Sequence, residues 1–495
     1  MKNCPQLRNA QTLNNVYMVD KIEYERLIES VFRRFPSVQK TSFAEAYKPG
    51  LDNIRCFCRK LGNPQDTYRT IHVAGTNGKG SVSSMLASVL SGAGLRTGLY
   101  TSPHIADFRE RMKISVDGKV AEMVSEEYVY DFIVGWQDVF DEMGLSFFEI
   151  TTAMAFKWFA DMGVDIAVIE TGLGGRLDST NIIRPDLSVV SSIGLDHCDI
   201  LGSTIDRIAY EKAGIFKPGV PAVVGHVSDD AAKVLRERYA VIQDMRDSVQ
   251  EAGFISGANV DAGRPELVFA DDIEPHLWHA HERILSAMDL RGSCQRLNLR
   301  TVLCALDVLA SRPDWRESET FQNALSEIGN DAHVAQSIER TAERMDFHGR
   351  WERISSSPDV ICDIGHNPQA LALNFKQLED YLRSGEYSSL IIVYGVMADK
   401  AFSEIMPLFP DSATWFFCTP DTRRALPSSD ILSICKEHFG ADVCNRMYDA
   451  GSVASAVRMA LKAASEYGGH PLVYIGGSTF VVSEASRLLL NVKNE

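Results

Sequence analysis

The sequence predicts an α/β protein with two sheets of mostly parallel strands, a larger one first and a smaller one at the end of the chain. Three observations support this fold class. Short, continuous apolar segments recur, as expected of parallel strands buried on both faces. Segments with one apolar helical face lie between them. With 495 residues, of which 45% are hydrophobic and 23% charged, the chain is long enough for more than one globular domain.

The larger predicted sheet begins with an apolar run that ends in glycines. Directly after it, apolar residues follow the i, i+3, i+4, i+7 spacing of one helical face, at Val82, Met85, Leu86, Val89 and Leu90. Further strand-like runs follow, so that the expected strands are 70–75, 96–102, 164–171, 186–193 and 220–225. Strands that alternate with helical stretches in this way predict a doubly wound parallel sheet.

The smaller predicted sheet follows after about residue 340. Its expected strands are 359–365, 389–396, 413–420 and 471–478, and a helical stripe between the first two comprises Leu371, Phe375, Leu378 and Leu382. The stretch 310–345 is rich in charge and poor in long apolar runs, so we expect the domain junction there. The predicted domains are residues 1–335 and 336–495.

Charge and composition exclude several classes of partner. With 50 Lys and Arg against 66 Asp and Glu, the formal net charge of −16 disfavours binding to nucleic acid or to anionic membranes. Anionic ligands would therefore need local basic residues or metal ions. No apolar run reaches the roughly 20 residues of a membrane span. The N-terminus lacks the apolar stretch of a secretory signal, and the ten cysteines show no paired spacing, so we expect a cytoplasmic protein.

A phosphate-binding loop is the first candidate site. The stretch "IHVAGTNGKGS" (71–81) departs from the usual G-x-x-x-x-G-K-[ST] pattern, yet it joins a strand to a helix. In that context backbone N–H groups converge on phosphate oxygens at the positive end of the helix, and a lysine reaches the terminal phosphates. The expected phosphate-binding residues are Gly75, Thr76, Asn77, Gly78, Lys79, Gly80 and Ser81.

Polar side chains at three strand ends form the second candidate site. Glu170 ends one expected strand, Ser102 and His104 end another, and Asp196 and His197 follow a third. The carboxyl ends of parallel strands meet at the ligand crevice of an open sheet. Mg²⁺ prefers oxygen ligands and bridges substrate phosphates, so Glu170 in particular predicts a magnesium site. Lys212, beside Glu211, has no such context, and from the residues alone a solvated helix end explains it equally well.

Together these motifs resemble the Mur ligase superfamily, and within it the folylpolyglutamate synthase/dihydrofolate synthase family. The matching stretches run in family order from about residue 20 to the end: "IHVAGTNGKGS", "YTSPHIADFRERMKI", "FFEITTAMAF", "ETGLGGRLDSTN", "GLDHCDILGSTIDRIAYEKAGIFKPG", "FHGRWE", "DIGHNPQAL", "VYGVMADKAF" and "YIGGSTFVVSE". Two positions depart from the family pattern: Gly365 replaces an alanine, with little expected effect, and Cys294 replaces a frequent histidine. Residues 225–290 match poorly, and "PHLWHAHE" within them is interpreted as an exposed loop rather than a metal site.

The resemblance implies an N-terminal P-loop ATPase domain and a smaller, C-terminal Rossmann-like domain. It implies Mg²⁺ ligands at Ser102, Glu170 and His197, with a second metal site supported by a carbamylated Lys212. The implied catalytic residues are Lys79, Lys212 and His366. Beyond the phosphate loop, the implied ATP contacts are Asn298, Arg350, Asp363 and His366, and the implied folate contacts are Phe148, Glu149, Ile150, Thr151, Leu177, Asp178 and Ser179.

The activity that the resemblance implies is ATP-dependent ligation of L-glutamate to a folate carboxylate through an acyl phosphate. "SFFEIT" favours a bifunctional enzyme that converts dihydropteroate to dihydrofolate and also lengthens tetrahydrofolate; polyglutamylation alone is the alternative. A Mur-type ligase acting on a non-folate acid, a P-loop kinase and a non-catalytic ATP-binding module are the rival classes. The expected partners are small molecules only, and the chain is expected to be a monomer.

Overall fold

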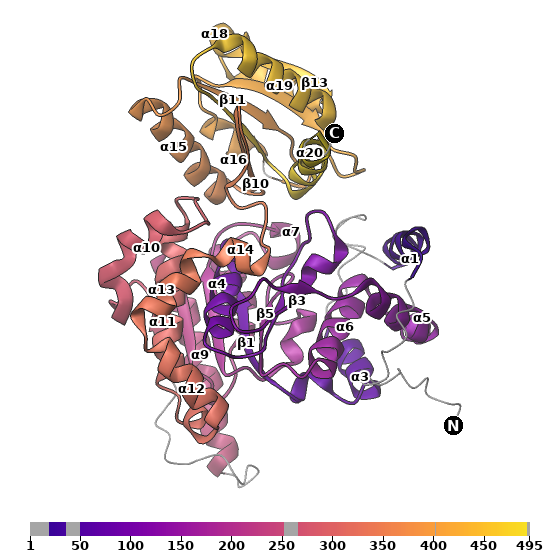
Figure 1. Cartoon of the computed structure of the whole chain (residues 1–495), viewed down its shortest axis with the longest axis vertical. Helices are drawn as coiled ribbons and strands as arrows, with labels where there is room; N and C mark the ends of the chain where they lie inside the picture. The colour runs from indigo at the N-terminus through magenta and orange to yellow at the C-terminus, as the bar shows by residue number, and fades with distance from the viewer. Residues whose placement is uncertain (1–18, 36–49, 252–265, 401, 493–495) are drawn as a thin grey trace.

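Two α/β domains stack along the long axis of the molecule, with the C-terminal domain above the larger N-terminal one (Figure 1). The computed structural model describes residues 19–35, 50–251, 266–400 and 402–492. Each strand expected from the sequence is present, and so are both predicted helices. No helix in these residues is long and apolar enough to cross a membrane.

The N-terminal domain contains an eight-stranded sheet with the order β4-β3-β2-β5-β1-β6-β7-β8. The six strands from β2 to β8 are parallel, whereas β3 and β4 are antiparallel to their neighbours at one edge. The strands are β1 (Arg69–Ala74), β2 (Thr97–Tyr100), β3 (Met112–Ser115), β4 (Glu122–Met123), β5 (Ile166–Glu170), β6 (Leu187–Ser192), β7 (Ala222–His226) and β8 (Leu267–Phe269).

Helices cover both faces of this sheet, as buried parallel strands require. On one face α4 packs with α11 to α14 over Ile71 and Val73. On the other face α3, α5 and α6 cover Ile169, and α8 and α9 cover Val190. The helices of this domain are α1 (Lys21–Arg34), α3 (Asp52–Lys60), α4 (Lys79–Gly92), α5 (Glu126–Met143), α6 (Phe147–Asp161), α7 (Cys198–Leu201), α8 (Ile205–Lys212), α9 (Asp229–Glu251), α10 (His281–Ala287), α11 (Gln295–Ala310), α12 (Glu319–Ile328), α13 (Asp331–Glu339) and α14 (Thr341–Met345).

The C-terminal domain contains a six-stranded sheet with the order β13-β12-β11-β14-β10-β9, parallel except for β9. Helices α15 and α17 pack on one face and α19 and α20 on the other. The elements are β9 (Glu352–Ser356), β10 (Asp359–Asp363), α15 (Pro368–Ser384), β11 (Ser389–Tyr394), α16 (Phe402–Ile405), β12 (Thr414–Thr419), α17 (Ser428–His438), α18 (Ala441–Cys444), β13 (Met447–Ser452), α19 (Val453–Tyr467), β14 (Pro471–Gly476) and α20 (Thr479–Val492).

The charge-rich stretch 310–345 is not a linker, because it folds into α12, α13 and α14 against α4. Its apolar residues are spaced for a single buried helical face, as Phe321, Ala324 and Ile328 illustrate, so no long apolar run is needed. The predicted boundary at residue 336 falls inside α13. The chain passes from one hydrophobic core to the other between Met345 and Trp351. Met345 packs in the core of the larger sheet, and Trp351 packs in that of the smaller sheet.

Candidate active site

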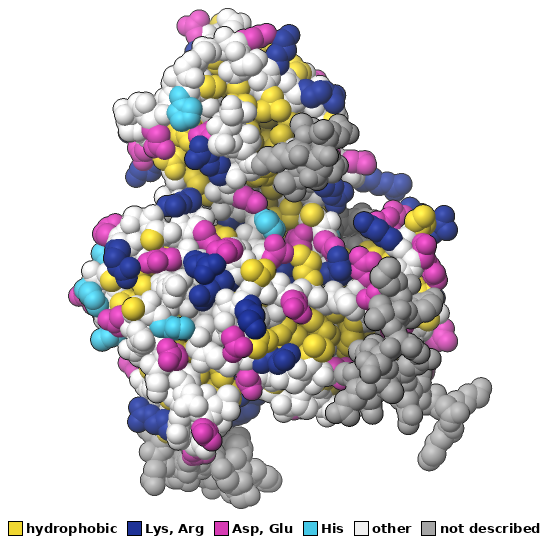
Figure 2. Space-filling model, viewed as in Figure 1, with side chains coloured by type: hydrophobic (Ala, Val, Ile, Leu, Met, Phe, Trp, Pro, Cys, Tyr) yellow, Lys and Arg dark blue, Asp and Glu magenta, His cyan; other side chains and the backbone are white. Residues whose placement is uncertain are grey.

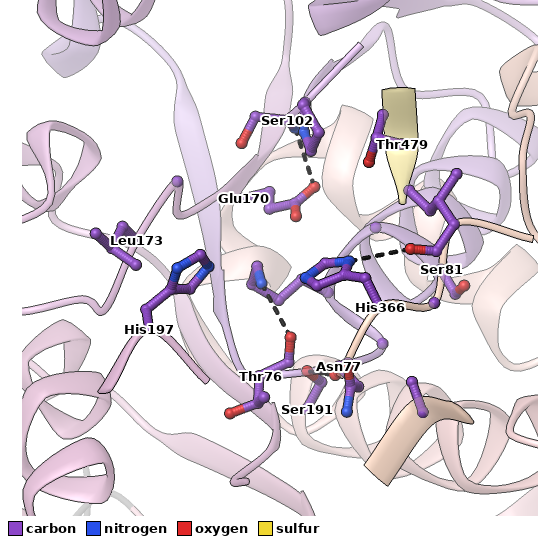
Figure 3. A pocket seen from close by; sticks show the side chains of 18 of the residues that line it. Thr76, Asn77, Ser81, Ser102, Glu170, Leu173, Ser191, His197, His366 and Thr479 are labelled. Atoms are coloured by element: carbon purple, nitrogen blue, oxygen red, sulfur yellow. Dashed lines mark hydrogen bonds between the residues drawn. The ribbon is translucent and has the colours of Figure 1, made fainter. Parts of the chain in front are cut away.

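A cavity between the two domains gathers most of the residues expected to bind ligands. It is walled by the carboxyl ends of the strands of the larger sheet and by loops of the C-terminal domain (Figure 3). The predicted residues that line it are Thr76, Asn77, Gly78, Lys79, Gly80, Ser81, Ser102, Phe148, Glu170, Leu177, Asp178, Ser179, His197, Asn298, Arg350, Asp363 and His366. Of the other predicted site residues, Gly75 begins the phosphate loop, and Lys212 lies behind it and donates to its carbonyl oxygen.

The phosphate loop joins the end of β1 to the start of α4, as the sequence predicted. Gly78 is the N-cap residue of α4 with φ of 83°, a left-handed conformation that favours glycine. A Cβ at Gly78 would also collide with the side-chain oxygen of Asn298, and one at Gly80 would lie 3.5 Å from a guanidinium nitrogen of Arg350. The loop backbone is therefore closely covered by two of the expected ATP-binding side chains.

Two lysine amines meet at a single carbonyl oxygen behind the loop. Lys79 Nζ donates to the carbonyl oxygen of Gly75 at 3.0 Å, and Lys212 Nζ donates to the same oxygen at 2.7 Å. Lys212 ends α8 and is 4% exposed. Burial, reinforced by the nearby charge of Lys79, lowers the pKa of Lys212 to about 7. Lys212 is thus a buried amine that is partly neutral at neutral pH, not a solvated helix end.

Glu170 is a buried carboxylate at the wall of the cavity, 3% exposed. Its Oε2 accepts the backbone N–H of Ser102 at 3.3 Å, which brings two of the expected metal ligands together (Figure 3). Burial raises the pKa of Glu170 to about 7, although Lys79 and Arg350 oppose the shift from a distance. No lysine or arginine among the described residues pairs directly with Glu170. A cation bound in the cavity would satisfy this carboxylate, so the residues present fit Mg²⁺.

His197, the third expected ligand, belongs to a neighbouring cluster with Asp196 and His366. One ligating atom from each of these side chains lies within 4.8 Å of the others. Lys400 Nζ also lies 2.5 Å from Asp196 Oδ1. Burial would raise the pKa of Asp196, but the hydrogen bond from His366 and the charges of His197 and Lys400 hold it well below its usual range. This cluster joins the two domains, because His366 and Lys400 come from the C-terminal one.

A second contact between the domains involves the phosphate loop itself. The side-chain amides of Asn77 and Asn367 bond to each other in both directions, at 2.8 and 3.2 Å, and Asn77 also donates to Gln369. Nearby, Asp363 accepts the backbone N–H of Trp351 and the side-chain amide of Asn374. The bonds of Asn77 connect the "DIGHNP" segment to the phosphate loop, whereas those of Asp363 fix that segment within its own domain.

Gly365, one of the two departures from the family pattern, has a local reason in this chain. A Cβ at this position would lie 2.8 Å from Asp363 Oδ1 and 2.9 Å from Asn374 Nδ2. Both distances are shorter than ordinary carbon contacts. The absence of a side chain therefore makes room for the hydrogen bond between Asp363 and Asn374.

The expected folate contacts divide into two groups. Phe148, Leu177, Asp178 and Ser179 line the cavity, whereas Glu149, Ile150 and Thr151 do not. Glu149 caps the first turn of α6 through Ser146, and Ile150 and Thr151 are buried in the core. The reason is geometric: consecutive residues of a helix point to different sides, so a run of four cannot all face one ligand.

Several cavity residues were not predicted from the sequence. They include Arg111, which ends the 3₁₀ helix Phe108–Arg111, and Lys400 and Gln369 from the C-terminal domain. Lys400 lies in "ADK" and Gln369 in "HNPQ"; both segments resemble family motifs, but the resemblance implied no role for these two side chains. The segment "PHLWHAHE" is not the exposed loop expected from the sequence: it forms the 3₁₀ helix His276–Ala280 and the start of α10, with Leu277 buried and His281 stacked on Trp278 at a centroid distance of 4.2 Å.

Basic side chains are dispersed over the face shown in Figure 2 but gathered in the cavity. Figure 2 shows acidic and basic side chains interspersed over one face, with no large patch of either sign. Inside the cavity, Lys79, Arg111, Arg350 and Lys400 provide the local basic residues that an acidic protein needs to attract an anionic nucleotide.

Comparison with known proteins identifies the two domains. Residues 73–243 match the Mur ligase middle domain, and residues 349–478 match the Mur ligase glutamate ligase domain. The chain is 31% identical to the dihydrofolate synthase/folylpolyglutamate synthase of Bacillus subtilis, covering 89% of this chain and 95% of that protein. It is also 31% identical to a probable bifunctional folylpolyglutamate synthase/dihydropteroate synthase of Haloferax volcanii, over 88% of this chain, although it spans only 48% of that protein's length.

A solved structure supports the same assignment. Mycobacterium tuberculosis folylpolyglutamate synthase, solved in complex with ADP, is 25% identical, with a TM-score of 0.72 over 95% of this chain and 99% of that one. The phosphate loop, the interdomain cavity and the extent of the similarity lead to one conclusion: the chain belongs to the dihydrofolate synthase/folylpolyglutamate synthase family of Mur ligases.

Proposed function

We propose that the chain joins L-glutamate to a folate carboxylate at the expense of ATP, converting dihydropteroate to dihydrofolate and lengthening tetrahydrofolate. The observation that carries the proposal is the single cavity between the domains. Its wall contains a phosphate loop, the buried carboxylate Glu170 and two aromatic side chains, Phe147 and Phe148. Such a cavity suits a nucleotide and an aromatic acid that meet end to end.

The first chemical step activates the acid. A carboxylate oxygen attacks the γ-phosphorus of ATP, the bond to the β,γ-bridging oxygen breaks, and ADP leaves as the acyl phosphate forms. This step needs positioning and charge neutralisation rather than a protein nucleophile. We assign the neutralisation to Lys79 and to Arg350, whose guanidinium lies against the start of α4. Asn298 and Asp363 would bind the rest of the nucleotide.

Mg²⁺ held by Ser102, Glu170 and His197 would neutralise phosphate charge. The fit rests on the carboxylate of Glu170, which forms no ion pair within the described residues, and on Ser102 beside it; His197 would reach the ion from the neighbouring cluster. A carbamate on Lys212 would add a further anionic ligand for a second ion. Its formation requires a neutral amine, and the lowered pKa of Lys212 supports that requirement.

The second step forms the amide. The amine of glutamate attacks the acyl carbon, the C–O bond to phosphate breaks, and inorganic phosphate leaves. The amine must lose a proton, and His366, 3.4 Å from Asp196, is the proposed acceptor. Because His366 belongs to the C-terminal domain, docking of that domain would complete the site and exclude water from the acyl phosphate.

One assay tests the proposal. Purified protein is incubated with ATP, Mg²⁺ and glutamate, and either dihydropteroate or tetrahydrofolate is added as the acceptor. We expect ADP release that depends on both acceptor and glutamate, with one ligated product per ADP by mass spectrometry. Lys79→Ala should lower this rate by at least about 100-fold while the melting temperature is kept. The absence of acceptor-dependent ADP release in the wild type would overturn the proposal.

The same assay separates the two versions of the activity. Turnover of both acceptors is expected of the bifunctional enzyme. Turnover of tetrahydrofolate without dihydropteroate would instead establish polyglutamylation alone. Phe148 and Asp178, which line the cavity in the segments that resemble pterin-binding ones, favour the bifunctional version.

A further inference from the structure

Arg111 is a buried cation at the wall of the cavity without a paired anion. Its side chain lies at the end of the 3₁₀ helix Phe108–Arg111, and the residue is 3% exposed. Its Nε donates to His104 Nδ1 at 2.9 Å, and its guanidinium carbon lies 5.4 Å from the ring centroid of Phe147. Within the described residues, no carboxylate forms an ion pair with it.

Glu110 and Glu170 act on Arg111 through their charge, but neither forms an ion pair with it among the described residues. Glu110 is next in the chain, but its carboxylate accepts three backbone N–H groups, from Ile105, Ala106 and Asp107, at 2.7 Å each. His104 accepts the Nε–H of Arg111 at its Nδ1, and an imidazole carries no negative charge to pair with the guanidinium. A buried guanidinium left in this state is costly unless a ligand anion pairs with it.

The position of Arg111 along the sheet indicates which anion this is. Strand order places β1, β5, β2 and β3 side by side. Their ends at the cavity carry, in that order, the phosphate loop with Lys79, then Glu170, Ser102 and Arg111. Since β3 is antiparallel, its amino-terminal end meets the carboxyl ends of the others. Adjacent strands are about 4.8 Å apart, so Arg111 lies roughly 10 Å beyond Glu170.

The wall of the cavity is aromatic beside Arg111. Phe147, on which the guanidinium stacks, and Phe148 begin α6. A ligand that extends from the phosphate loop towards Phe147 therefore has Arg111 beside it, between its phosphates and its aromatic part. In the proposed reaction, the group at that point is the acceptor carboxylate.

Resting on the proposed function, we propose that Arg111 binds the carboxylate of the folate substrate that receives the phosphoryl group. A planar guanidinium can hold both carboxylate oxygens. One oxygen then attacks the γ-phosphorus as its bond to ADP breaks, and the other remains on Arg111. When the amine of glutamate attacks, the same oxygen carries the charge of the tetrahedral intermediate until phosphate leaves. Arg111 is thus a catalytic residue that contacts the substrate in both steps.

The loop that carries Arg111 also contacts the C-terminal domain. Ile105 packs among the apolar residues of that domain, and Ser483 Oγ donates to the carbonyl oxygen of Ile105. His104, which orients the guanidinium, lies between Ile105 and Ser102. Docking of the C-terminal domain therefore helps to fix the loop, and with it the position of the Arg111 guanidinium relative to the acyl carbon.

The test compares Arg111→Gln with Arg109→Gln, a matched variant two residues away. Arg109 pairs with Asp107 at 2.7 Å and is outside the cavity wall. The probes are the acceptor that supports ADP release by the wild type and the methyl ester of its carboxyl group. Because hydrogen bonds to charged groups contribute about 1.5–3 kcal/mol, Arg111→Gln should weaken binding of the acid about 10- to 150-fold. Binding of the ester and of ADP should be unchanged, and kcat should fall.

The controls distinguish this role from the alternatives. Arg109→Gln should bind acid and ester as the wild type does, and Arg111→Lys should recover part of the preference for the acid. Equal loss of acid and ester binding in Arg111→Gln would overturn the inference in favour of a structural role. So would a raised KM for glutamate with unchanged binding of the acid. If the wild type releases no ADP with either acceptor, the proposed function fails; if it does and Arg111→Gln matches it, only the inference fails.

Discussion

The two ends of α4 offer a controlled test of the phosphate loop. Gly78, at the amino-terminal end, has φ of +83°, and Gly94, just after the carboxyl-terminal end, has φ of +89°. This left-handed conformation destabilises a residue with a Cβ by about 1–2 kcal/mol, so the backbone strain should lower the free energy of unfolding equally in Gly78→Ala and Gly94→Ala. They differ in surroundings: a Cβ at Gly94 meets nothing within 4 Å, whereas one at Gly78 collides with Asn298.

Displacing Asn298 adds to the cost at Gly78. Its side-chain amide donates to Gln295 Oε1 at 2.9 Å, and loss of that hydrogen bond costs about 1 kcal/mol more. Gly94→Ala should therefore lower the melting temperature by about 2–8 °C, and Gly78→Ala by a few degrees more. Only Gly78→Ala should raise the KM for ATP, by at least about tenfold, since it moves Asn298 and the loop amides together.

Thermal melting of the nucleotide-free variants and initial rates at varied ATP measure both effects. Glutamate and acceptor are kept saturating so that only the ATP dependence changes. A KM for ATP in Gly78→Ala that equals that of Gly94→Ala would refute the assignment of this loop to ATP. Equal melting temperatures would refute the predicted collision.

Three further predictions follow from the charges of the molecule. Burial raises the pKa of Glu170 from 4.5 to about 7, so its charge destabilises the folded protein fully above about pH 7 and not at all below about pH 4.5. Metal-free Glu170→Gln should therefore melt at a higher temperature than the wild type at about pH 8 but not at about pH 5. The same variant should lose ligase activity. His348 bonds to Asp346 and Glu352, which raise its pKa to about 10. The charge of His348 therefore stabilises the fold fully below about pH 6.5, and this stabilisation is lost as the pH rises through about 10. The difference in melting temperature between the wild type and His348→Gln should vanish above about pH 10. With ¹³C-labelled bicarbonate, a carbamate carbon signal should appear in the wild type and be missing in Lys212→Arg, and its absence from both would contradict the proposed carbamate.

The fold was predictable where strands are buried on both faces. β5 and β11 are apolar runs with one polar residue at an end, β1 is buried beyond its first residue, and each formed a strand as expected. β3 and β13 were missed because their sequences, "MKIS" and "MYDAGS", are short or polar. Lys113 in β3 illustrates the difficulty: it is buried, and its amine bonds to backbone carbonyl groups of Met345 and Asp346, far along the chain.

The site was predictable where one local rule applied. The ends of parallel strands carry Ser102 and Glu170, and these do lie together. The rule overlooks Arg111, because β3 is antiparallel and reaches the same edge with its amino-terminal end. It also overlooks Lys400, which approaches Asp196 from 204 residues away and only through the docking of the two domains. Resemblance located the segment around Phe148, but only the helix geometry shows which of its side chains face the cavity.

The central claim, that ATP phosphorylates the acceptor carboxylate before glutamate attacks, has one direct measurement. The acceptor is labelled with ¹⁸O in its carboxyl group, and the inorganic phosphate released during ligation is examined by mass spectrometry. Attack of the labelled carboxylate on the γ-phosphorus predicts that one ¹⁸O atom is transferred to each phosphate. Phosphate that carries no ¹⁸O from the acceptor, while the ligated product still forms, would contradict the account.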